Sequence, residues 1–541
     1  MSNHLPVLIV GAGPTGLMMA CELERRDIPF RIIDKNSGPT QGSNATWIQT
    51  RALEMFDAQG LADEFLRIGY RCDAINLYEG EKNLIHLPLK YLDSCYPFIL
   101  MLPQRETEEL LNQYLQKARI RVERPVELIN VRQQNATVVA TVKRPDGDTE
   151  VITSHWLVAC DGASSTVREK CQIYFPGGDV SEQFVVADAQ MSSFLPNNEV
   201  HVFFDKGTIF PDKSTVFAVF PWGSNKYRIN ANLYLDRPRQ MFTEHEVREI
   251  IAERAYGAFV AEQVSWISPF WIHSKVVQQM RHGSIFFVGD AAHIHSPAGG
   301  QGMNTGLQDA YNLAWKLALV IRGKTSPLLL DSYQQERHPV NANIVNQTEY
   351  FTKMLLFDKT FFTKLHRFER KLLRNPEPLT KRVSMELTQL AIRYQHSPII
   401  DYQQGVHKQA PQSGERMPDI MINAVRLYHY LQGTEHYVWL FLGIQPSSRM
   451  LAKAKRMQKT LHQVFPQLVK TYLVSGRVIS DIADVIFDVD GVLHRRFCVK
   501  KSAVYVVRPD TYIGYCSRKI DINAVQVFLQ EYLSGVLRNT G

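Results

Sequence analysis

The stretch "VLIVGAGPTGLMMACELERRDIPFRIIDK" (Val7–Lys35) places a glycine-rich turn between two short apolar runs. Apolar runs of this length bounded by glycine are typical of buried strands. The pattern predicts a strand over 5–10, a helix that continues to about Arg26 and a second strand over 30–33. A strand, a glycine turn, a helix and a second strand in this order are typical of an α/β fold with a parallel sheet.

The glycines and the acid of this stretch indicate a dinucleotide site. Gly11 permits the tight turn, Gly13 lets the backbone approach a pyrophosphate, and Gly16 lets helix and strand pack closely. Free N–H groups at the start of the helix bind the phosphate charge. Asp34, at the tip of the second strand, is placed to accept hydrogen bonds from ribose hydroxyls, which favours FAD or NAD over NADP.

Length and composition are those of an ordinary globular protein with several domains. The chain has 541 residues, 45% of them hydrophobic and 21% charged. No apolar run approaches the length of a membrane span. The formal charge of +7 arises from clusters that we interpret as solvated helix faces, so we expect no nucleic-acid partner. Seven scattered cysteines without a CxxC pair indicate reduced thiols and a cytoplasmic location.

Two further motifs follow strands in the same way. "WLVACDGASSTVRE" (Trp156–Glu169) reads as a strand that ends at Asp161, with Arg168 nearby. "GDAAHIHSPAGGQGMNTGLQDA" (Gly289–Ala310) follows a predicted strand over 285–288. A helix is expected from Met303 or Asn304 onwards, because apolar residues recur there at helical spacing. The apolar positions are Leu307, Ala310, Ala314, Leu317 and Ile321.

The three motifs, in this order and spacing, resemble those of the class A flavoprotein monooxygenases, which include phenol and polyketide hydroxylases. The resemblance implies non-covalently bound FAD in a Rossmann-like domain of the GR2 type. Asp290 would then hold the ribityl or ribose hydroxyls. Gly300 and Gly302 would let the chain run under the isoalloxazine, where a Cβ would clash. The amides of Met303 and Asn304, at the helix start, would face the flavin edge on which negative charge develops.

Two less specific matches and the second motif extend the expected cofactor site. Arg51 lies in a segment that resembles the family's R-x-LE helix, so it is a candidate for neutralising the FAD pyrophosphate. Gln104 lies in a segment whose glutamine reaches the FAD ribose in the family. Asp161, with Arg168, would lie by the pyrophosphate or by the path of the nicotinamide donor.

The histidines of the third motif have several interpretations. His293 and His295 form an H-x-H pair, but no third ligand is apparent, so we predict no metal site. Hydrogen bonds that hold the loop are the simpler interpretation, and a proton relay is the alternative. Together with Pro297, whose family counterpart places its carbonyl close to the reactive flavin edge, His295 is a flavin-edge candidate.

The segment 181–275 alternates between apolar and polar residues, which predicts an antiparallel sheet with one face in water. In the family such a sheet covers the flavin, and strands from about 70–100 add to it. Phe220, Trp222 and Tyr227 are candidates for contact with a flat apolar substrate, although ordinary core positions would explain them too. Thr46 stands where relatives that hydroxylate simple phenols carry an acid, so no base for deprotonating a phenol is identified.

The C-terminal third resembles the thioredoxin-like domain of the phenol and polyketide hydroxylases. It lacks CxxC, so thiol–disulfide exchange is not available to it. We expect it to be structural or to form a homodimer. The predicted domains are an FAD-binding domain (1–180 with 276–345), a substrate-binding β domain (181–275), bridging helices (346–396) and the thioredoxin-like domain (397–541).

The resemblance implies an FAD-dependent monooxygenase that hydroxylates an aromatic, phenolic or polycyclic, substrate with NAD(P)H and O2 through a C4a-hydroperoxyflavin. No second GxGxxG exists, so NADH or NADPH would bind transiently. Baeyer–Villiger oxidation or epoxidation on the same scaffold is the alternative. A second alternative is a protein that binds flavin but catalyses no reaction.

Overall fold

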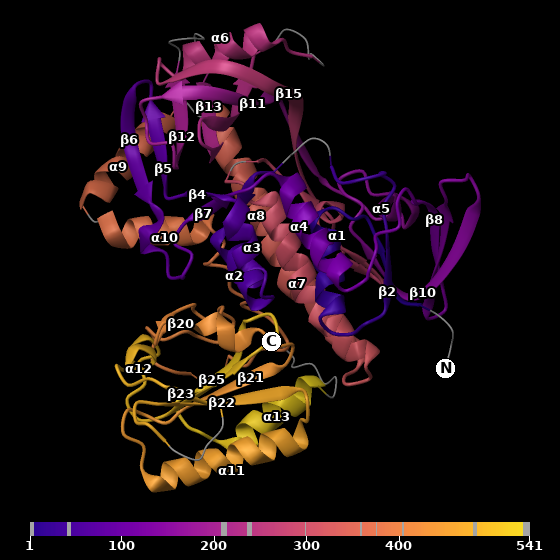
Figure 1. Cartoon of the computed structure of the whole chain (residues 1–541), viewed down its shortest axis with the longest axis vertical. Helices are drawn as coiled ribbons and strands as arrows, with labels where there is room; N and C mark the ends of the chain where they lie inside the picture. Colours follow the sequence, from indigo (N-terminus) through magenta and orange to yellow (C-terminus); the bar gives the residue numbers. More distant parts are fainter. Residues whose placement is uncertain are drawn as a thin grey trace.

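The computed structural model describes residues 5–40, 45–206, 214–234, 241–297, 299–357, 360–374, 376–402, 405–479 and 484–533. The fold is mixed α/β: a parallel sheet with helices, a large antiparallel sheet at one end and a C-terminal unit at the other (Figure 1). Within these residues, no helix combines the length and the apolar character that crossing a bilayer requires.

The first sheet has four parallel strands at its centre, in the order β2, β1, β10, β17. Their apolar side chains are buried, as expected where helices cover a parallel sheet. The strands predicted over 5–10 and 30–33 are confirmed at those bounds. The strands of this sheet are β1 (Leu5–Val10), β2 (Phe30–Ile33), β8 (Glu127–Gln134), β9 (Thr137–Lys143), β10 (Thr149–Ala159), β16 (Arg281–His282) and β17 (Ile285–Phe287).

Three helices share the core of this sheet: α1 (Pro14–Glu24), α4 (Gln104–Lys117) and α7 (Gly302–Ile321). In Figure 1, α1 lies beside both α4 and α7. α1 ends two residues before the predicted position, and α7 begins one residue before it. The apolar positions predicted on α7 are buried except Ile321, which is half-buried, so the helical period located this core element correctly.

The second sheet has eight strands in the order β18-β15-β11-β14-β13-β12-β5-β6, and only β12 and β5 pair in parallel. β5 and β6 come from the region around 70–100. Helix α6 (Glu244–Arg254) packs on the outer face (Figure 1). The strands are β5 (Ala74–Glu79), β6 (Lys82–Pro88), β11 (Gly177–Ser193), β12 (Glu199–Lys206), β13 (Ser214–Gly223), β14 (Lys226–Leu233), β15 (Phe259–Val276) and β18 (His293–Ile294).

The prediction that one face of this sheet lies in water is wrong. Arg228 and Asn232 are polar residues that alternate with the apolar ones of β14, so they belong to the face expected to be in contact with solvent. They are 4% and 0% exposed. The Arg228 guanidinium donates two hydrogen bonds to Asp188, at 2.8 and 2.7 Å, so its charge is compensated within the protein. Period-two alternation identifies two faces, but it cannot reveal that other elements cover the polar one.

The covering elements are three consecutive helices and a small sheet. Leu355, Phe362 and Leu372 share an apolar cluster with Phe184 and Phe204 of the inner sheet face. The predicted boundary at 345/346 falls inside α8. The helices are α8 (Asp331–Phe357), α9 (Phe361–Arg374) and α10 (Pro376–Leu387), and the small sheet contains β3 (Trp47–Ile48), β7 (Ile99–Met101) and β4 (Tyr70–Cys72).

The C-terminal unit is built on a five-stranded sheet in the order β23-β22-β21-β24-β25. β21, β22 and β23 are parallel, whereas β24 and β25 run antiparallel to their neighbours. Its elements are β21 (His436–Phe441), α11 (Ser448–Val464), β22 (Val469–Ser475), β23 (Val485–Phe487), α12 (Val492–Arg496), β24 (Ala503–Val507), β25 (Ile513–Ser517) and α13 (Ile522–Leu533).

A buried charge network joins this unit to α7 and α8. Arg508 donates to both carboxylate oxygens of Glu336, at 2.5 and 2.9 Å, and Nε donates to Asp510 at 3.0 Å. Lys316 donates to Glu336 at 2.7 Å, and Trp315 donates to Asp510 at 3.1 Å. Burial lowers the pKa of Lys316 to about 8 despite Glu336. Although burial alone would raise the pKa of Glu336, Arg508 and Lys316 hold it far below its ordinary value.

We expect Arg508→Met to lower the free energy of unfolding by roughly 3–5 kcal/mol, because Lys316 would then be the one cation of this network left beside two buried carboxylates, Glu336 and Asp510. Arg382→Met removes a 78% exposed arginine paired with Glu386 and should change it by less than ~1 kcal/mol. Urea denaturation of both variants measures the difference. Equal destabilisation by the two substitutions would contradict this account of the network.

Candidate functional site

The three motif loops meet where the N-terminal ends of α1 and α7 come together. A Cβ on Gly306 would lie 2.4 Å from Thr15 Oγ1, and one on Gly289 would lie 2.6 Å from the same oxygen. Gly289 also has a φ of +62°, a conformation that side-chain-bearing residues rarely adopt. Glycine at both positions therefore lets α1 and α7 approach one another at the end of β17.

The first loop is folded tightly against the strands beneath it. A Cβ on Gly16 would lie 1.9 Å from the Gly11 carbonyl oxygen, which confirms the predicted close packing of helix and strand. The Asp34 carboxylate accepts from the Ala12 N–H at 2.6 Å and the Asn36 N–H at 2.8 Å. Asp34 thus holds the turn in shape. A guanidinium nitrogen of Arg124 lies 3.6 Å from Asp34 Oδ1.

The second motif, around Asp161 and Arg168, contacts the loop of the third motif. The Asp161 carboxylate accepts from Ser165 Oγ at 2.6 Å and the Val167 N–H at 3.0 Å, so it caps the short helix α5 (Thr166–Lys170). Burial raises the pKa of Asp161. Arg168 donates to the Ala291 carbonyl at 3.0 Å, which ties α5 to the loop after β17.

Asp290 and two helix ends have the chemistry to hold a dinucleotide. Within the described residues, no hydrogen bond or ion pair joins the Asp290 carboxylate to the protein. Its side chain is exposed, and the surrounding protein raises its pKa, a shift that His293 opposes. Gly13 and Gln301 occupy the N-cap positions of α1 and α7. Neither residue accepts a hydrogen bond from its helix through a side chain, so the first N–H groups of both helices have no side-chain acceptor there. These donors and this acceptor fit the phosphates and hydroxyls of FAD.

Asn304 fastens the glycine loop to strand β3. Its amide donates to the carbonyls of Trp47 and Gly300, both at 2.8 Å, and its Oδ1 accepts from the Gln49 N–H at 2.8 Å. Gln49 in turn donates to the Gly299 carbonyl at 2.8 Å. Asn304 was predicted to face the flavin through its amide, and the structure shows that its side chain is used within the protein.

Trp47 explains why residue 300 is a glycine. A Cβ on Gly300 would lie 2.7 Å from the Trp47 ring, and Phe220 meets that ring edge-on at 5.5 Å between centroids. That Gly300 also makes room for the isoalloxazine stays a prediction. Trp47 and Gln49 were not identified from sequence, because nothing local marks a two-residue strand as part of the site.

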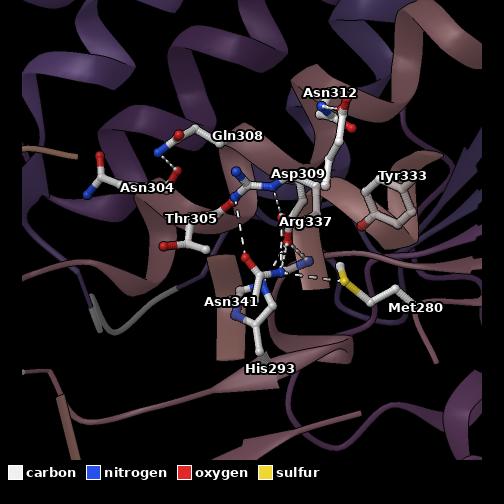
Figure 2. Close-up of polar contacts among 12 residues, drawn as sticks. Met280, His293, Asn304, Thr305, Gln308, Asp309, Asn312, Tyr333, Arg337 and Asn341 are labelled. Atoms are coloured by element: carbon white, nitrogen blue, oxygen red, sulfur yellow. Dashed lines mark hydrogen bonds and ion pairs between the residues drawn. The ribbon is translucent and has the colours of Figure 1, made fainter. Parts of the chain in front are cut away.

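His293 belongs to a fully buried polar network behind the third loop. Figure 2 shows His293, Arg337 and Asn341 around Asp309. His293 Nε2 lies 2.7 Å from one Asp309 oxygen, and Arg337 Nε donates to the other at 2.7 Å. Burial alone would raise the pKa of Asp309, but Arg337 and His293 hold it below its ordinary value. Hydrogen bonding that holds the loop accounts for this histidine.

His295 and Pro297 lie on the same loop, with different surroundings. His295 Nδ1 lies 2.8 Å from the Ser296 carbonyl, so Nδ1 carries the proton and Nε2 is an acceptor. Within the described residues, Nε2 is buried without a partner, and burial lowers the pKa of His295 to about 4. The Pro297 carbonyl accepts from the Gly300 N–H at 2.9 Å. Gly302 and Met303 form the first turn of α7 beside this loop.

The structure gives Arg51 a role different from the predicted one. Its side chain is 1% exposed and donates to Tyr428 Oη, the Asp510 carbonyl and Thr511 Oγ1, at 2.9–3.1 Å. Arg51 therefore joins α2 (Thr50–Ala58) to the C-terminal unit, and a pyrophosphate has no access to it. Gln104 lies in the first turn of α4 and donates to Glu108 at 2.9 Å.

The three substrate candidates separate onto opposite faces of the large sheet. Phe220 and Trp222 pack with Trp47 on the inner face. Tyr227 is 1% exposed and packs with Phe259 and α6 on the outer face. The prediction that Tyr227 contacts a substrate is wrong for this reason. Among the described residues, histidine, cysteine and acidic side chains form no group of three that could hold a metal ion.

Comparisons with known proteins agree with this site. A family model described as an FAD-binding domain matches residues 4–348. The chain belongs to this FAD-binding family, whose members among its relatives are flavin-dependent monooxygenases of aromatic and polyketide compounds.

Individual relatives cover most of the chain. The 6-methylpretetramide 4-monooxygenase of Streptomyces rimosus is 35% identical over 74% of this chain and 72% of its own length. The pentachlorophenol 4-monooxygenase of Sphingobium chlorophenolicum is 30% identical over 95% of this chain and 94% of its own. The solved structure of an anhydrotetracycline hydroxylase from Streptomyces rimosus superposes with a TM-score of 0.72 at 28% identity, covering 98% of this chain and 99% of its own.

Gly306→Ala should lower both the stability and the FAD content of the purified protein. Alanine favours a helix by about 1 kcal/mol over glycine, but its Cβ would push Thr15 and α1 away, at a cost of ~1–3 kcal/mol. The measurements are the melting temperature and the flavin absorbance per polypeptide. Gly405→Ala, where a Cβ meets nothing within 4 Å, is the control. A more stable, fully yellow Gly306→Ala protein would refute the packing argument.

The His295 environment predicts a pH dependence of stability. Its pKa in the folded protein is about 4, below its ordinary value of about 6.5. The unfolded chain therefore binds a proton that the folded one does not, and stability falls as the pH drops from about 6.5 towards 4. His295→Asn should lose less stability over this range than the parent protein. His245→Asn, at an 81% exposed site, should match the parent in urea titrations at both pH values, and an unchanged slope for His295→Asn would disprove the assignment.

Proposed function

We propose that this chain is an FAD-dependent monooxygenase that uses NADH or NADPH and O2 to hydroxylate an aromatic substrate. The observation that carries the proposal is the convergence of two uncapped helix N-termini on the unpartnered Asp290 carboxylate. Membership of the FAD-binding family supports the cofactor. FAD, when bound, supplies two-electron redox chemistry and the activation of dioxygen.

Each group of residues has a distinct task in this proposal. The first turn of α1, shaped by Gly11, Gly13 and Gly16, binds the pyrophosphate. Asp34 accepts a hydrogen bond from a hydroxyl of the adenosine ribose. To do so, one of its oxygens must accept from the ribose in addition to, or in place of, the backbone N–H that it now binds. Asp290 accepts hydrogen bonds from the ribityl hydroxyls. Gln104, Gly300, Gly302, Met303 and the Asp161 helix remain candidates for the remaining contacts of the cofactor.

His295 and Pro297 are the proposed groups at the flavin edge. His295 presents an unprotonated Nε2 as an acceptor, and its low pKa keeps it neutral at physiological pH. A neutral acceptor suits a proton relay or the hydroxyl of a bound substrate. Pro297 shapes the turn that leads to Gly300.

The inner face of the large sheet is the proposed wall of the substrate chamber. Trp47, Phe220 and Trp222 supply flat apolar surface, which suits an aromatic ring system. Trp222 Nε1 is buried without an acceptor among the described residues, so it can donate to a substrate oxygen. The threonine at position 46 cannot act as the base that would deprotonate a phenol. Its backbone carbonyl accepts from the Leu102 N–H. The relatives' tetracycline-type compounds lead us to favour a polycyclic substrate.

The C-terminal unit is proposed to be thioredoxin-like and structural. Its strand order, with α11 between two parallel strands and α13 after the antiparallel pair, supports this topology. The loop between β21 and α11 contains Pro446 and Ser447 and no cysteine. Arg51 and Arg508 bind the unit firmly to the rest of the chain. We also propose a cytoplasmic location, and homodimer formation stays a prediction.

Incubation of the purified yellow protein with NADH or NADPH and a panel of phenols and polycyclic aromatics tests the function. We expect one group of ligands to stimulate nucleotide oxidation and to give a product heavier by one oxygen atom. An oxygen inserted next to a ketone, or an epoxide, would indicate the alternative chemistry. A yellow protein that oxidises neither nucleotide with any ligand would leave only a flavin-binding role.

A further inference from the structure

A cleft of about 800 Å³ lies beside the glycine-rich turn, and apart from Leu17 in the first turn of α1 it is lined by none of the residues assigned to FAD. Its walls are one side of α4, the turn after β2 and the segment that returns from α4 to the sheet edge. In Figure 1, α1 lies beside α4, and α1 also contacts β2. The lining residues are Leu17, Ser37, Gly38, Pro39, Glu108, Asn112, Gln116, Arg119, Arg121, Val122 and Arg124.

Three arginines give this cleft its charge. Arg119 and Arg121 are exposed, and within the described residues no hydrogen bond or ion pair involves either guanidinium. Arg124 forms part of the cleft wall, where it donates to the Gly38 carbonyl at 2.5 Å and the Ala12 carbonyl at 3.0 Å. Guanidinium groups bind phosphate oxygens through paired hydrogen bonds.

The acid in the cleft accepts hydrogen bonds from neutral groups of the protein. Glu108 accepts from the Thr40 N–H and hydroxyl, both at 3.0 Å, and from Gln104 at 2.9 Å. These bonds hold the turn after β2 against α4. The lining therefore carries three arginines against one carboxylate, a net charge of +2, which favours an anionic ligand.

The rest of the lining fits a nucleoside. Leu17, Pro39 and Val122 offer apolar surface to a base, while the amides of Asn112 and Gln116 offer donors and acceptors to ribose hydroxyls. Asp34, which serves the FAD ribose in the proposed function, is not part of the lining. The cleft is adjacent to that site, because Arg124 contacts both Ala12 and Asp34, but it is separate from it.

We propose that this cleft binds the 2′-phosphorylated adenosine of NADPH, the transient reductant. The inference rests on the proposed function, and it makes NADPH the preferred nucleotide over NADH. A 2′-phosphate is a dianion that arginine accommodates in dinucleotide sites, and Arg119 and Arg121 are the residues with unused donors. NADH carries a hydroxyl in place of the 2′-phosphate, so it offers these arginines no dianion at that position.

The experiment uses the FAD-loaded enzyme, so that FAD already occupies its own site. 2′,5′-ADP is titrated into the parent protein and into Arg119→Gln/Arg121→Gln, with 5′-AMP and inorganic phosphate in parallel. We expect 2′,5′-ADP to bind the parent at least about tenfold more tightly than either comparison ligand and more tightly than the double variant by about the same factor. Arg132→Gln, an exposed arginine on β8 outside the cleft, should bind like the parent.

Steady-state kinetics with both nucleotides separates the possible outcomes. The double variant should raise KM for NADPH about tenfold, more than it changes kcat, and leave KM for NADH and the FAD content unaltered. A loss of FAD with unchanged KM for NADPH would assign the cleft to FAD and overturn the inference. Equal effects on NADPH and NADH, or equal binding of inorganic phosphate, would also overturn it. A parent enzyme that oxidises neither nucleotide would instead refute the proposed function.

Discussion

The close contact of Thr15 with Gly289 and Gly306 is the constraint on which the rest of the site depends. It brings the N-terminal ends of two helices, far apart in the sequence, to the end of one strand. Both helices then direct uncompensated N–H groups towards the same region, and Asp290 adds an acceptor there. Any larger residue at the contact would separate the two helix dipoles, and the region would lose its affinity for an extended dinucleotide.

The buried charges around this contact are arranged to hold it in place. Asp309 receives His293, Arg337 and Asn341 behind the third loop, and Asp161 and Arg168 brace it from the other side. Asp290 differs from these groups, because within the described part of the chain no hydrogen bond or ion pair engages its carboxylate, although the charge of His293 acts on it. This difference supports Asp290 as the acceptor for a ligand.

The parts predicted from sequence are those determined by local pattern. The first two strands, the turn at Gly11 and Gly16 and helix α7 follow from spacing alone, because glycine and apolar periodicity act over a few residues. Arg51, Tyr227 and the face of Arg228 could not be placed in this way. Their environment is determined by other elements of the fold: α6 for Tyr227, α8 for the face of Arg228 and the C-terminal unit for Arg51. Trp47 and Gln49 carry no local signal, since their contacts with the glycine loop exist only after folding.

Helix α7 begins at the glycine loop and, about four turns later, contacts the C-terminal unit through Trp315, whose indole N–H donates to Asp510. Exchange of C-terminal units between homologous enzymes therefore involves more than an exposed linker. A graft without the Arg508–Asp510 pair would leave Glu336 with Lys316 and without its two bonds from Arg508, at a helix that begins beside the proposed cofactor site. Compatible grafts must preserve this electrostatic match, so these two segments are expected to evolve together.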